Sequence, residues 1–446
     1  MKSTGHIRDL PRVAGARRLA LASAAAAACA AVMPAHATNG YFAHGYGVKQ
    51  AGMGGVSTAL AQDTFGGANN PASMVWVGPR MDLGLTWFHP ERYAERSGAG
   101  IPSLNGKVDS GSQDFAIPEF GYNAMINSAL SLGVSVYGNG GMNTNYPQGN
   151  FNCGAGPANM LCGSGTLGVN MSQLIIAPTM AYKVNDRNAI GASVLLGYQR
   201  FKAYGLQAFD NAPGFPPFTS DPGHVTNNGT DTAYGAGLRI GWQGRVSDMV
   251  ALGATYSTKV YMGKFDKYSG LFAEQGDFDI PMNFSLGIAL TPNSQWTIAA
   301  DYQRIYYSQI ASVGNPSAPN PPAPLGADNG PGFGWQDINV FKLGVAYAMN
   351  DKWTLRAGID IGGNPIQSQD VTFNIIAPGV VKNHYTLGFT FAPSKADEIS
   401  GAFMYAQRNS VTGSSLFNNV FPAPVAGSET ISMREFSLGI GWGRKF

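Results

Sequence analysis

Three basic residues lie in runs where large apolar residues alternate with small or polar ones, and each falls on the small and polar side: Arg239, Lys342 and Arg356. If these runs are strands, all three side chains point to the same kind of face. A base there could satisfy the carboxylate of an amphiphilic ligand, which is unstable in a buried site without a partner. The same bases could instead pair with acidic residues on that face, such as Asp301 and Asp360.

Two cysteines lie close together in a stretch rich in glycine and proline, FNCGAGPANMLCG. In an oxidising compartment Cys153 and Cys162 would form a disulfide. A metal site is the poorer interpretation, because the stretch offers no further cysteine or histidine as a ligand. We therefore expect a disulfide that holds a surface loop.

Catalytic and nucleotide-binding motifs are missing from the sequence. The glycines near the N-terminus do not form G-x-G-x-x-G after a strand, and G-x-x-x-x-G-K-[ST] does not occur. The histidines lack the spacing of a metal site. His384 is a further candidate for the basic face, but it has no assignable nucleophile as a catalytic partner. We expect a protein that is not an enzyme and holds no metal or cofactor.

The N-terminus has the three parts of a secretory signal peptide. A basic start containing Arg12 precedes an apolar, alanine-rich run over 19–33, and the sequence A-H-A before Thr38 matches a cleavage site. Removing residues 1–37 takes away five basic residues and one acidic residue, which turns the net charge of +2 into −2. The charge of the full chain therefore gives no reason to expect nucleic acid as a partner.

The composition indicates a membrane protein built from strands. Of the 446 residues, 59 are glycine, 44% are hydrophobic and only 13% are charged, whereas ordinary soluble domains contain about 25% charged residues. The mean hydropathy is −0.07. After the signal peptide, no run of about 18 apolar residues is present to form a membrane helix. Strands that face lipid on one side and a lumen on the other would produce these averages.

Fourteen candidate strands follow one another along the chain. Short turns alternate with long loops rich in proline, glycine and asparagine, which is typical of bacterial outer-membrane barrels. We predict an all-β fold, a fourteen-stranded antiparallel transmembrane barrel formed by residues 80–446. The predicted strands are 81–89, 113–126, 129–142, 168–184, 188–204, 230–246, 249–263, 278–291, 294–308, 338–349, 352–362, 380–392, 397–409 and 429–446.

The last predicted strand shows the alternation clearly. Phe436, Leu438, Ile440 and Trp442 fall on one face, and serine and glycine fall on the other. The chain ends on Phe446 in phase with the apolar face, as in barrels that the outer-membrane assembly machinery recognises. We expect a monomer in the outer membrane of a Gram-negative bacterium, with the barrel assembly machinery and outer-membrane lipid as partners.

Residues 38–79 differ from the rest of the chain. They contain few large apolar side chains and no convincing alternation, so they cannot build a core of their own. A fourteen-stranded barrel encloses a lumen that leaks unless it is filled. We predict that residues 38–79 form a plug inside this lumen.

The stretch GYGVKQAGMGGVSTALAQDTFGGANNPASM resembles the plug of FadL-type outer-membrane transporters, which import long-chain fatty acids and, in some members, aromatic hydrocarbons. The family pattern is a glycine-rich start, then A-G-x-G, then N-P-A before the first strand. Residues 51–54 match the second part, and Asn70, Pro71 and Ala72 match the third. The resemblance implies that this N-P-A motif lies beside the bound substrate; a purely structural role is the alternative.

Residues 117–141 resemble the second and third strands of the same family, where a kink opens the barrel wall. Gly138, Asn139, Gly140 and Gly141 would weaken a ladder and favour a bulge. The resemblance implies a lateral portal at these residues, through which an apolar cargo could enter the bilayer without exposing apolar surface to water again. The alternative is a strand end that simply continues into a glycine-rich loop.

We expect uptake of hydrophobic molecules, above all long-chain fatty acids, by ligand-gated passive diffusion with lateral release. Aromatic or aliphatic hydrocarbons are the alternative cargo, and a surface adhesin or a general porin is the alternative function. The inward rows are mostly small residues rather than the charged residues of a porin. Long loops over 89–112, 206–229 and 309–337 carry Phe, Tyr and Leu and could form an outer groove that captures the ligand.

Overall fold

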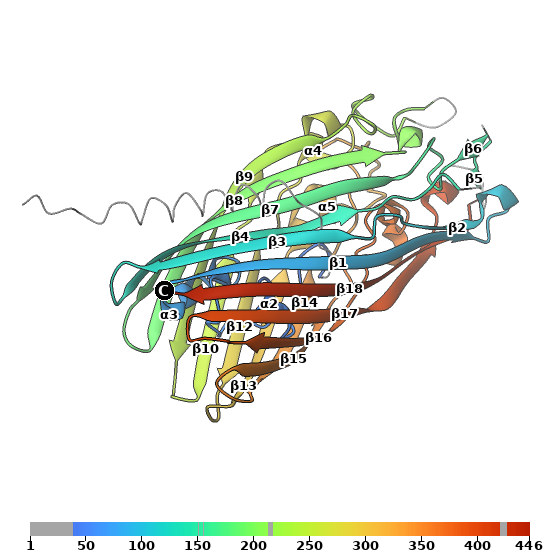
Figure 1. Ribbon diagram of the computed structural model, residues 1–446. Helices are drawn as coiled ribbons and strands as arrows, with labels where there is room; N and C mark the ends of the chain where they lie inside the picture. Colours follow the sequence, from blue (N-terminus) through green and yellow to red (C-terminus); the bar gives the residue numbers. More distant parts are fainter. Residues whose placement is uncertain (1–38, 150, 155, 213–216, 420–425) are drawn as a thin grey trace, which may run out of the picture.

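The protein folds into a closed antiparallel barrel (Figure 1). Neighbouring strands in the sequence pair with each other, and β1 closes the sheet by pairing with β18. The computed structural model describes residues 39–149, 151–154, 156–212, 217–419 and 426–446. The fourteen long strands are β1 (Arg80–Ser97), β3 (Phe115–Met125), β4 (Leu130–Asn143), β7 (Gly168–Lys183), β8 (Asn188–Tyr204), β9 (Asp231–Arg245), β10 (Val250–Ser257), β12 (Asn283–Leu290), β13 (Trp296–Ile305), β14 (Ile338–Ala348), β15 (Trp353–Gly362), β16 (Asn383–Phe391), β17 (Asp397–Ser414) and β18 (Ser428–Lys445).

Short elements fill the lumen and the loops. The remaining strands are β2 (Gly106–Asp109), β5 (Phe151–Asn152), β6 (Pro157–Ala158) and β11 (Tyr261–Met262). The α-helices are α2 (Val48–Ala51), α3 (Met74–Val77), α4 (Ala273–Gly276) and α5 (Ala311–Gly314). The 3-10 helices are η1 (Phe65–Gly67), η2 (Pro71–Ser73), η3 (Pro102–Leu104), η4 (Gln207–Phe209), η5 (Asp266–Tyr268), η6 (Tyr307–Gln309), η7 (Ser368–Asp370), η8 (Phe373–Ile375) and η9 (Leu416–Asn419). Within the described residues, no helix has the length and apolarity to cross a membrane.

The fourteen predicted strands are confirmed, and the differences are confined to their ends. The largest concerns the first strand, which was predicted to stop before Pro90 but continues to Ser97. Because Phe446 N donates to Pro79 O (3.0 Å), the odd-numbered residues of β1 face β18 and the even-numbered ones face β3. The pairing of β1 with β3 ends at Phe88, so the donorless nitrogen of Pro90 interrupts no ladder.

The outward face of the barrel is apolar, as the alternation predicts. Tyr234 is 71% exposed and Leu238 is 52% exposed, although both lie in the middle of a paired strand. Trp296 begins β13 next to a short turn and packs on Tyr347 of β14, with ring centroids 4.6 Å apart. Such rings mark the membrane boundary of outer-membrane barrels.

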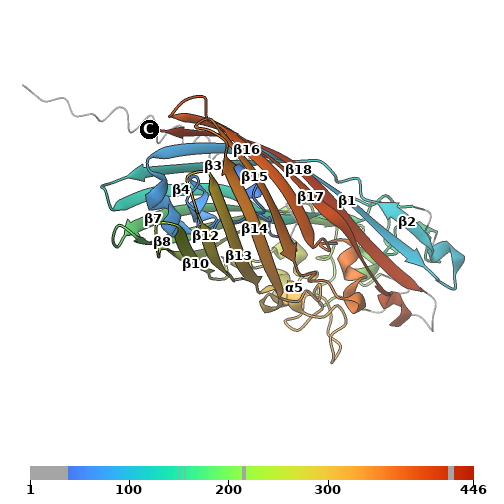
Figure 2. The same ribbon diagram turned by 90° about the horizontal axis from the view of Figure 1, so that it is seen from below.

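The long loops gather at one end of the barrel, and the C-terminus lies at the other (Figure 2). One large apolar core joins these loops to the adjoining strand ends and to Tyr41 and Phe42 near the start of the described chain. This apolar core lies at the end of the barrel that carries the long loops.

Candidate functional site

Residues 39–79, here called the lumenal segment, contact strands on different sides of the barrel. Asn39 Nδ2 donates to Asp360 Oδ2 on β15 (2.9 Å), and Ser57 N donates to Asp301 Oδ2 on β13 (2.8 Å). Further bonds reach β1, β4 and β9. A segment that bonds to strands all round a barrel lies inside it.

Glycines line the wall at several places where the lumenal segment comes close. A Cβ on Gly388 of β16 would lie 2.9 Å from Gly52 Cα, and a Cβ on Gly358 of β15 would overlap Gly54 N. Similar contacts occur on β9, where Gly241 faces Asn70. The inward glycine rows therefore let the two backbones touch, which larger residues would prevent.

The N-P-A motif holds the segment against β9. Asn70 is completely buried; its Nδ2 donates to Thr58 O (2.7 Å) and Trp242 O (2.9 Å), and its Oδ1 accepts from Ala72 N (3.1 Å). Pro71 begins η2 directly after this cap, where its missing N–H is not needed. The geometry therefore gives Asn70, Pro71 and Ala72 structural contacts in the lumen.

The three candidate carboxylate-binding bases point inward, and each has partners. Arg239 Nη1 donates to Gly67 O (2.8 Å), and Lys342 Nζ donates to His44 O (2.8 Å). Arg356 Nη1 donates to a threonine hydroxyl on β16 (2.7 Å). Arg239 and Lys342 therefore bind the backbone of the lumenal segment.

The inward acids hold the same segment. Asp301 accepts from the backbone of Ser57, and Asp360 accepts from Asn39. His384 Nδ1 lies 3.3 Å from Asp360 Oδ1, and its ring stacks on that of His44 with centroids 5.9 Å apart. Among the described residues, no group of three or more His, Cys, Asp or Glu side chains is placed to hold a metal ion.

Charged side chains connect the lumenal segment to the barrel near the short-turn end. Lys49 of the lumenal segment and Arg80 at the start of β1 both contact Glu398 at the start of β17. Arg80 Nε also donates to Asp82 Oδ2 (2.9 Å), which accepts from Thr64 N as well (3.0 Å). Separating these charges without replacing their partners would be unfavourable.

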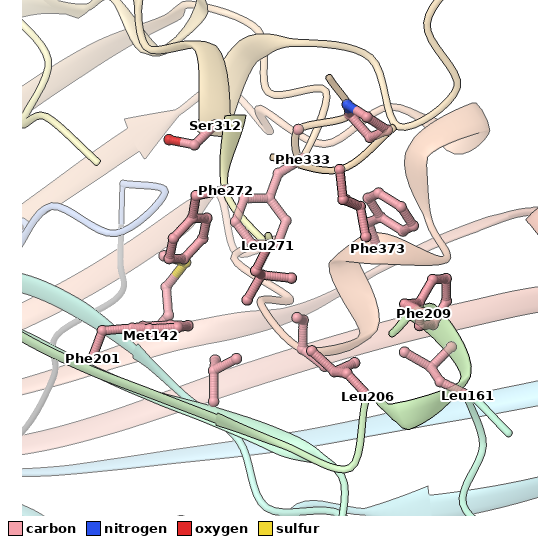
Figure 3. A pocket seen from close by; sticks show the side chains of 15 residues that line it. Met142, Leu161, Phe201, Leu206, Phe209, Leu271, Phe272, Ser312, Phe333 and Phe373 are labelled. Atoms are coloured by element: carbon pink, nitrogen blue, oxygen red, sulfur yellow. The ribbon is translucent and has the colours of Figure 1, made fainter. Parts of the chain in front are cut away.

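A small apolar cavity lies among the long loops (Figure 3). Its lining contains a single side-chain polar group, the hydroxyl of Ser312, which has no hydrogen-bond partner among the described residues. No lining residue is charged. The lining residues are Met142, Leu161, Val169, Phe201, Leu206, Phe209, Leu271, Phe272, Ser312, Leu325, Pro331, Gly332, Phe333, Phe373 and Ile376.

The predicted capture loops contribute to this cavity in part. Loops 206–229 and 309–337 supply lining residues, but 89–112 supplies none, because much of it continues β1 or forms β2. Sequence reasoning missed the contributions of three further loops, which include Leu161, Phe272 and Phe373. The sequence signal that could have indicated these contributions is the presence of large apolar residues within otherwise polar loops.

Aromatic rings connect the cavity to the lumenal segment. Phe272 of the lining packs on Phe278 (5.0 Å between centroids), and Phe278 packs on Tyr41 (6.0 Å). On another side, Phe333 packs on Trp335 (6.4 Å), which packs on Tyr41 (5.7 Å). The first described residues of the lumenal segment therefore support the lining.

A second, small polar cavity lies inside the barrel. Phe42, the neighbour of Tyr41, belongs to its lining, and so do Arg239, Lys342 and Asp301. The structure therefore brings two of the three candidate bases to one cavity. Neither of them lines the apolar cavity, and Arg356 lines neither.

The hydrogen-bonded ladder between β3 and β4 is interrupted. Their ladder stops at the pair Phe120–Val136, although β3 continues beside β1 and β4 continues beside β7. The two chains meet again toward the loops, where Gly111 N donates to Asn145 O (2.7 Å). The space between these two contacts is called the wall window below.

Residues 138–141, the candidate portal, form part of the β4 edge of the window. The register between β4 and β7 slips by one residue between Gly138 and Gly140, so Asn139 forms a bulge. Gly140 forms a β-bridge with Phe42 of the lumenal segment instead of pairing with β3. Two residues further on, Met142 lines the apolar cavity. The window edge and the cavity are therefore contiguous.

Two further features lie in the loops around the cavity. Cys153 and Cys162 are joined by a disulfide (S–S 2.01 Å) in the loop next to Leu161. In the loop that carries Phe272, burial raises the pKa of Asp277 to about 6, and neighbouring carboxylates add to this effect.

A family model described as outer membrane protein transport protein (OMPP1/FadL/TodX) matches residues 19–418. A search among curated proteins gave no match.

Similar solved structures include the toluene transporter TodX of Pseudomonas putida, with 20% identity, a TM-score of 0.66 and coverage of 92% of this chain and 100% of that chain. The toluene transporter TbuX of Ralstonia pickettii has 18% identity, a TM-score of 0.61 and coverage of 90% and 99%. A FadL homologue of Pseudomonas aeruginosa has 16% identity, a TM-score of 0.63 and coverage of 93% and 100%. At such identities the likeness shows the fold, but the family model spans most of the sequence, and the chain therefore belongs to the OMPP1/FadL/TodX family of outer-membrane transport proteins.

Proposed function

We propose that this outer-membrane channel takes up small uncharged hydrophobic molecules, such as monoaromatic hydrocarbons. The observation that carries the proposal is the apolar cavity, whose lining has no charged side chain. Moving an apolar molecule from water into it gains about 25 cal/mol per Å² of buried surface. A carboxylate in the same place would lose its hydration without gaining a cation.

We propose lateral release through the wall window as the route out of the cavity. Met142 belongs to both the cavity lining and the β4 edge of the window. The other direction leads to the ion pairs around Glu398, which an apolar molecule cannot replace. Transport would be passive and gated by the bound molecule: movement of Tyr41 and Phe42, which support the cavity and cover the window edge, would open the path.

A long-chain fatty acid is the second candidate cargo, and the polar cavity supports it. A tail in the apolar cavity and a carboxylate near Arg239 and Lys342 would satisfy both ends. This requires Phe42 to move and both bases to release their backbone partners. We place it second because an uncharged cargo does not require Arg239 and Lys342 to release their backbone partners.

The other functions that the sequence left open have less support. The lumenal segment, bonded to strands on several sides, works against a general porin. An adhesin would present its loops outward, whereas here the large apolar loop residues pack into one core with a cavity.

Uptake of radiolabelled toluene and oleate tests the proposal, in cells that lack their own hydrophobic transporters. Cells with the protein should accumulate toluene faster than cells without it. Leu271→Asp places a charge in the apolar lining and should reduce toluene uptake about tenfold or more. Ile101→Asp, at an exposed loop position outside that cavity, is the matched control and should not.

The outcomes separate the candidates. Oleate uptake that Lys342→Met abolishes, without toluene uptake, would move the fatty acid to first place. Uptake of neither compound by cells with a correctly folded barrel would refute transport of these molecules and favour the adhesin.

A further inference from the structure

Pro118 lies on the β3 edge of the wall window. Successive residues of a strand direct their backbone N–H and C=O groups to opposite neighbours. Ile126 N donates to Leu130 O at the β3–β4 turn (2.8 Å), and β3 shows no register slip, so its even-numbered residues face β4. The nitrogen of Pro118 therefore faces the window, and it carries no hydrogen.

The ladder between β3 and β4 stops where this proline would have to pair. If the register of the Phe120–Val136 pair continued, Pro118 and Gly138 would be the next two residues whose backbone N–H and C=O groups point across the gap. Pro118 offers no donor there, and Gly138 is the residue at which β4 begins to slip relative to β7. Both residue types are unfavourable in the interior of a strand.

The lumenal segment uses the strand edge that β3 leaves free. Phe42 forms a bridge with Gly140, and Tyr46 Oη donates to Asn139 O (3.1 Å). On the opposite edge, Glu119 accepts from the backbone of the lumenal segment through Oε1 (3.1 Å). The segment thus binds both sides of the window from inside, and closure of the β3–β4 ladder would compete with its bridge to Gly140.

We propose that Pro118 is a positioning residue that keeps the wall window open. Without a donor at this position, β3 cannot extend its ladder along β4, and the β4 edge stays available to the lumenal segment. The inference rests on the proposed function, in which the cargo leaves through the window. It adds a residue of β3 that determines whether this exit exists.

Pro118→Thr restores an N–H that faces β4, in a residue type that favours strands. We expect the ladder to extend. The Ala116 amide, which faces the same gap, should then exchange its hydrogen about tenfold more slowly, because one added hydrogen bond changes the exchange rate by about this factor. Toluene uptake by cells should fall by a similar factor. Binding of toluene to the purified protein should not change, because Pro118 does not line the apolar cavity.

Pro178→Thr is the matched control. Val184 N donates to Asn188 O (2.8 Å), so Pro178 on β7 faces β8, where the ladder resumes on both sides of it. A donor added there meets a wall that is already closed, and uptake should be unchanged. On the Pro118→Thr background, Ala116→Pro removes another donor from the window edge and should restore uptake, which excludes a general folding defect.

Unchanged exchange at Ala116 in a folded Pro118→Thr protein would overturn the proposal. Slower exchange with undiminished uptake would overturn the window as the exit. If the unsubstituted protein neither binds nor transports toluene, the proposed function fails instead, and hydrogen exchange at Ala116 still decides the role of Pro118.

Discussion

Replacing Asn70 with alanine tests whether the N-P-A motif holds the lumenal segment or contacts the cargo. The change removes the donated bonds to Thr58 O and Trp242 O and the accepted bond from Ala72 N. Each bond contributes about 1 kcal/mol net, and all three lie in a buried site where the freed partners lose further stability. We therefore expect the free energy of unfolding to fall by about 3 kcal/mol.

Urea unfolding of the purified protein in lipid vesicles, followed by tryptophan fluorescence, measures this loss. Asn69→Ala is the matched control, because Asn69 is half-buried and its side chain donates one bond, to Tyr46 O (3.0 Å). It should lose about 1 kcal/mol or less. Toluene binding should be the same in both variants, since neither residue lines the apolar cavity.

Two results would refute this reasoning. A loss below about 1 kcal/mol for Asn70→Ala would mean that water or a neighbouring side chain replaces the three bonds. A normal stability combined with toluene binding at least about tenfold weaker, equal to about 1.4 kcal/mol, would place Asn70 at the ligand, as the family resemblance implies.

Two other predictions concern the lumenal segment and the loops. Gly358→Ala places a methyl group against Gly54 N, so the segment should loosen, and limited proteolysis should cleave within residues 39–79 faster than in the parent protein; equal cleavage would contradict the close approach. Asp277 has a pKa raised to about 6, above its ordinary value, so its ionised form opposes the folded loop above pH 6 and this penalty disappears as the pH falls toward 4. Hydrogen exchange in this loop should be slower at pH 5 than at pH 7 after correction for the intrinsic rate, and Asp277→Asn should abolish the difference; a difference that persists would assign it to another group.

The strands of this protein could be read from its sequence because their signal is local. A lipid-facing residue and a lumen-facing residue alternate, so each strand carries its own period of two, as Phe436 to Trp442 show in β18. Proline was the misleading local signal. Its effect depends on which neighbour its nitrogen faces, so Pro90 does not end β1.

The sequence predicted the candidate site less completely. Alternation placed Arg239, Lys342 and Arg356 on the inward face, but it could not show that the lumenal segment supplies the partners of Arg239 and Lys342. The apolar cavity combines residues from several loops and strand ends that are far apart in the chain. No period relates such residues, so their meeting depends on how the loops pack.

By itself, the sequence determined a barrel of fourteen strands, an outward apolar face and the glycines that weaken β4, because these follow from residue type and short-range periodicity. Only the tertiary structure decided that the apolar cavity carries no charge, that Arg239 and Lys342 bind the lumenal segment, and that the ladder between β3 and β4 stops at Phe120 and Val136. The reason is that a ladder is a property of two strands together. Its register would place Pro118 opposite Gly138, next to the bulge at Asn139, and this register is visible only in the folded sheet.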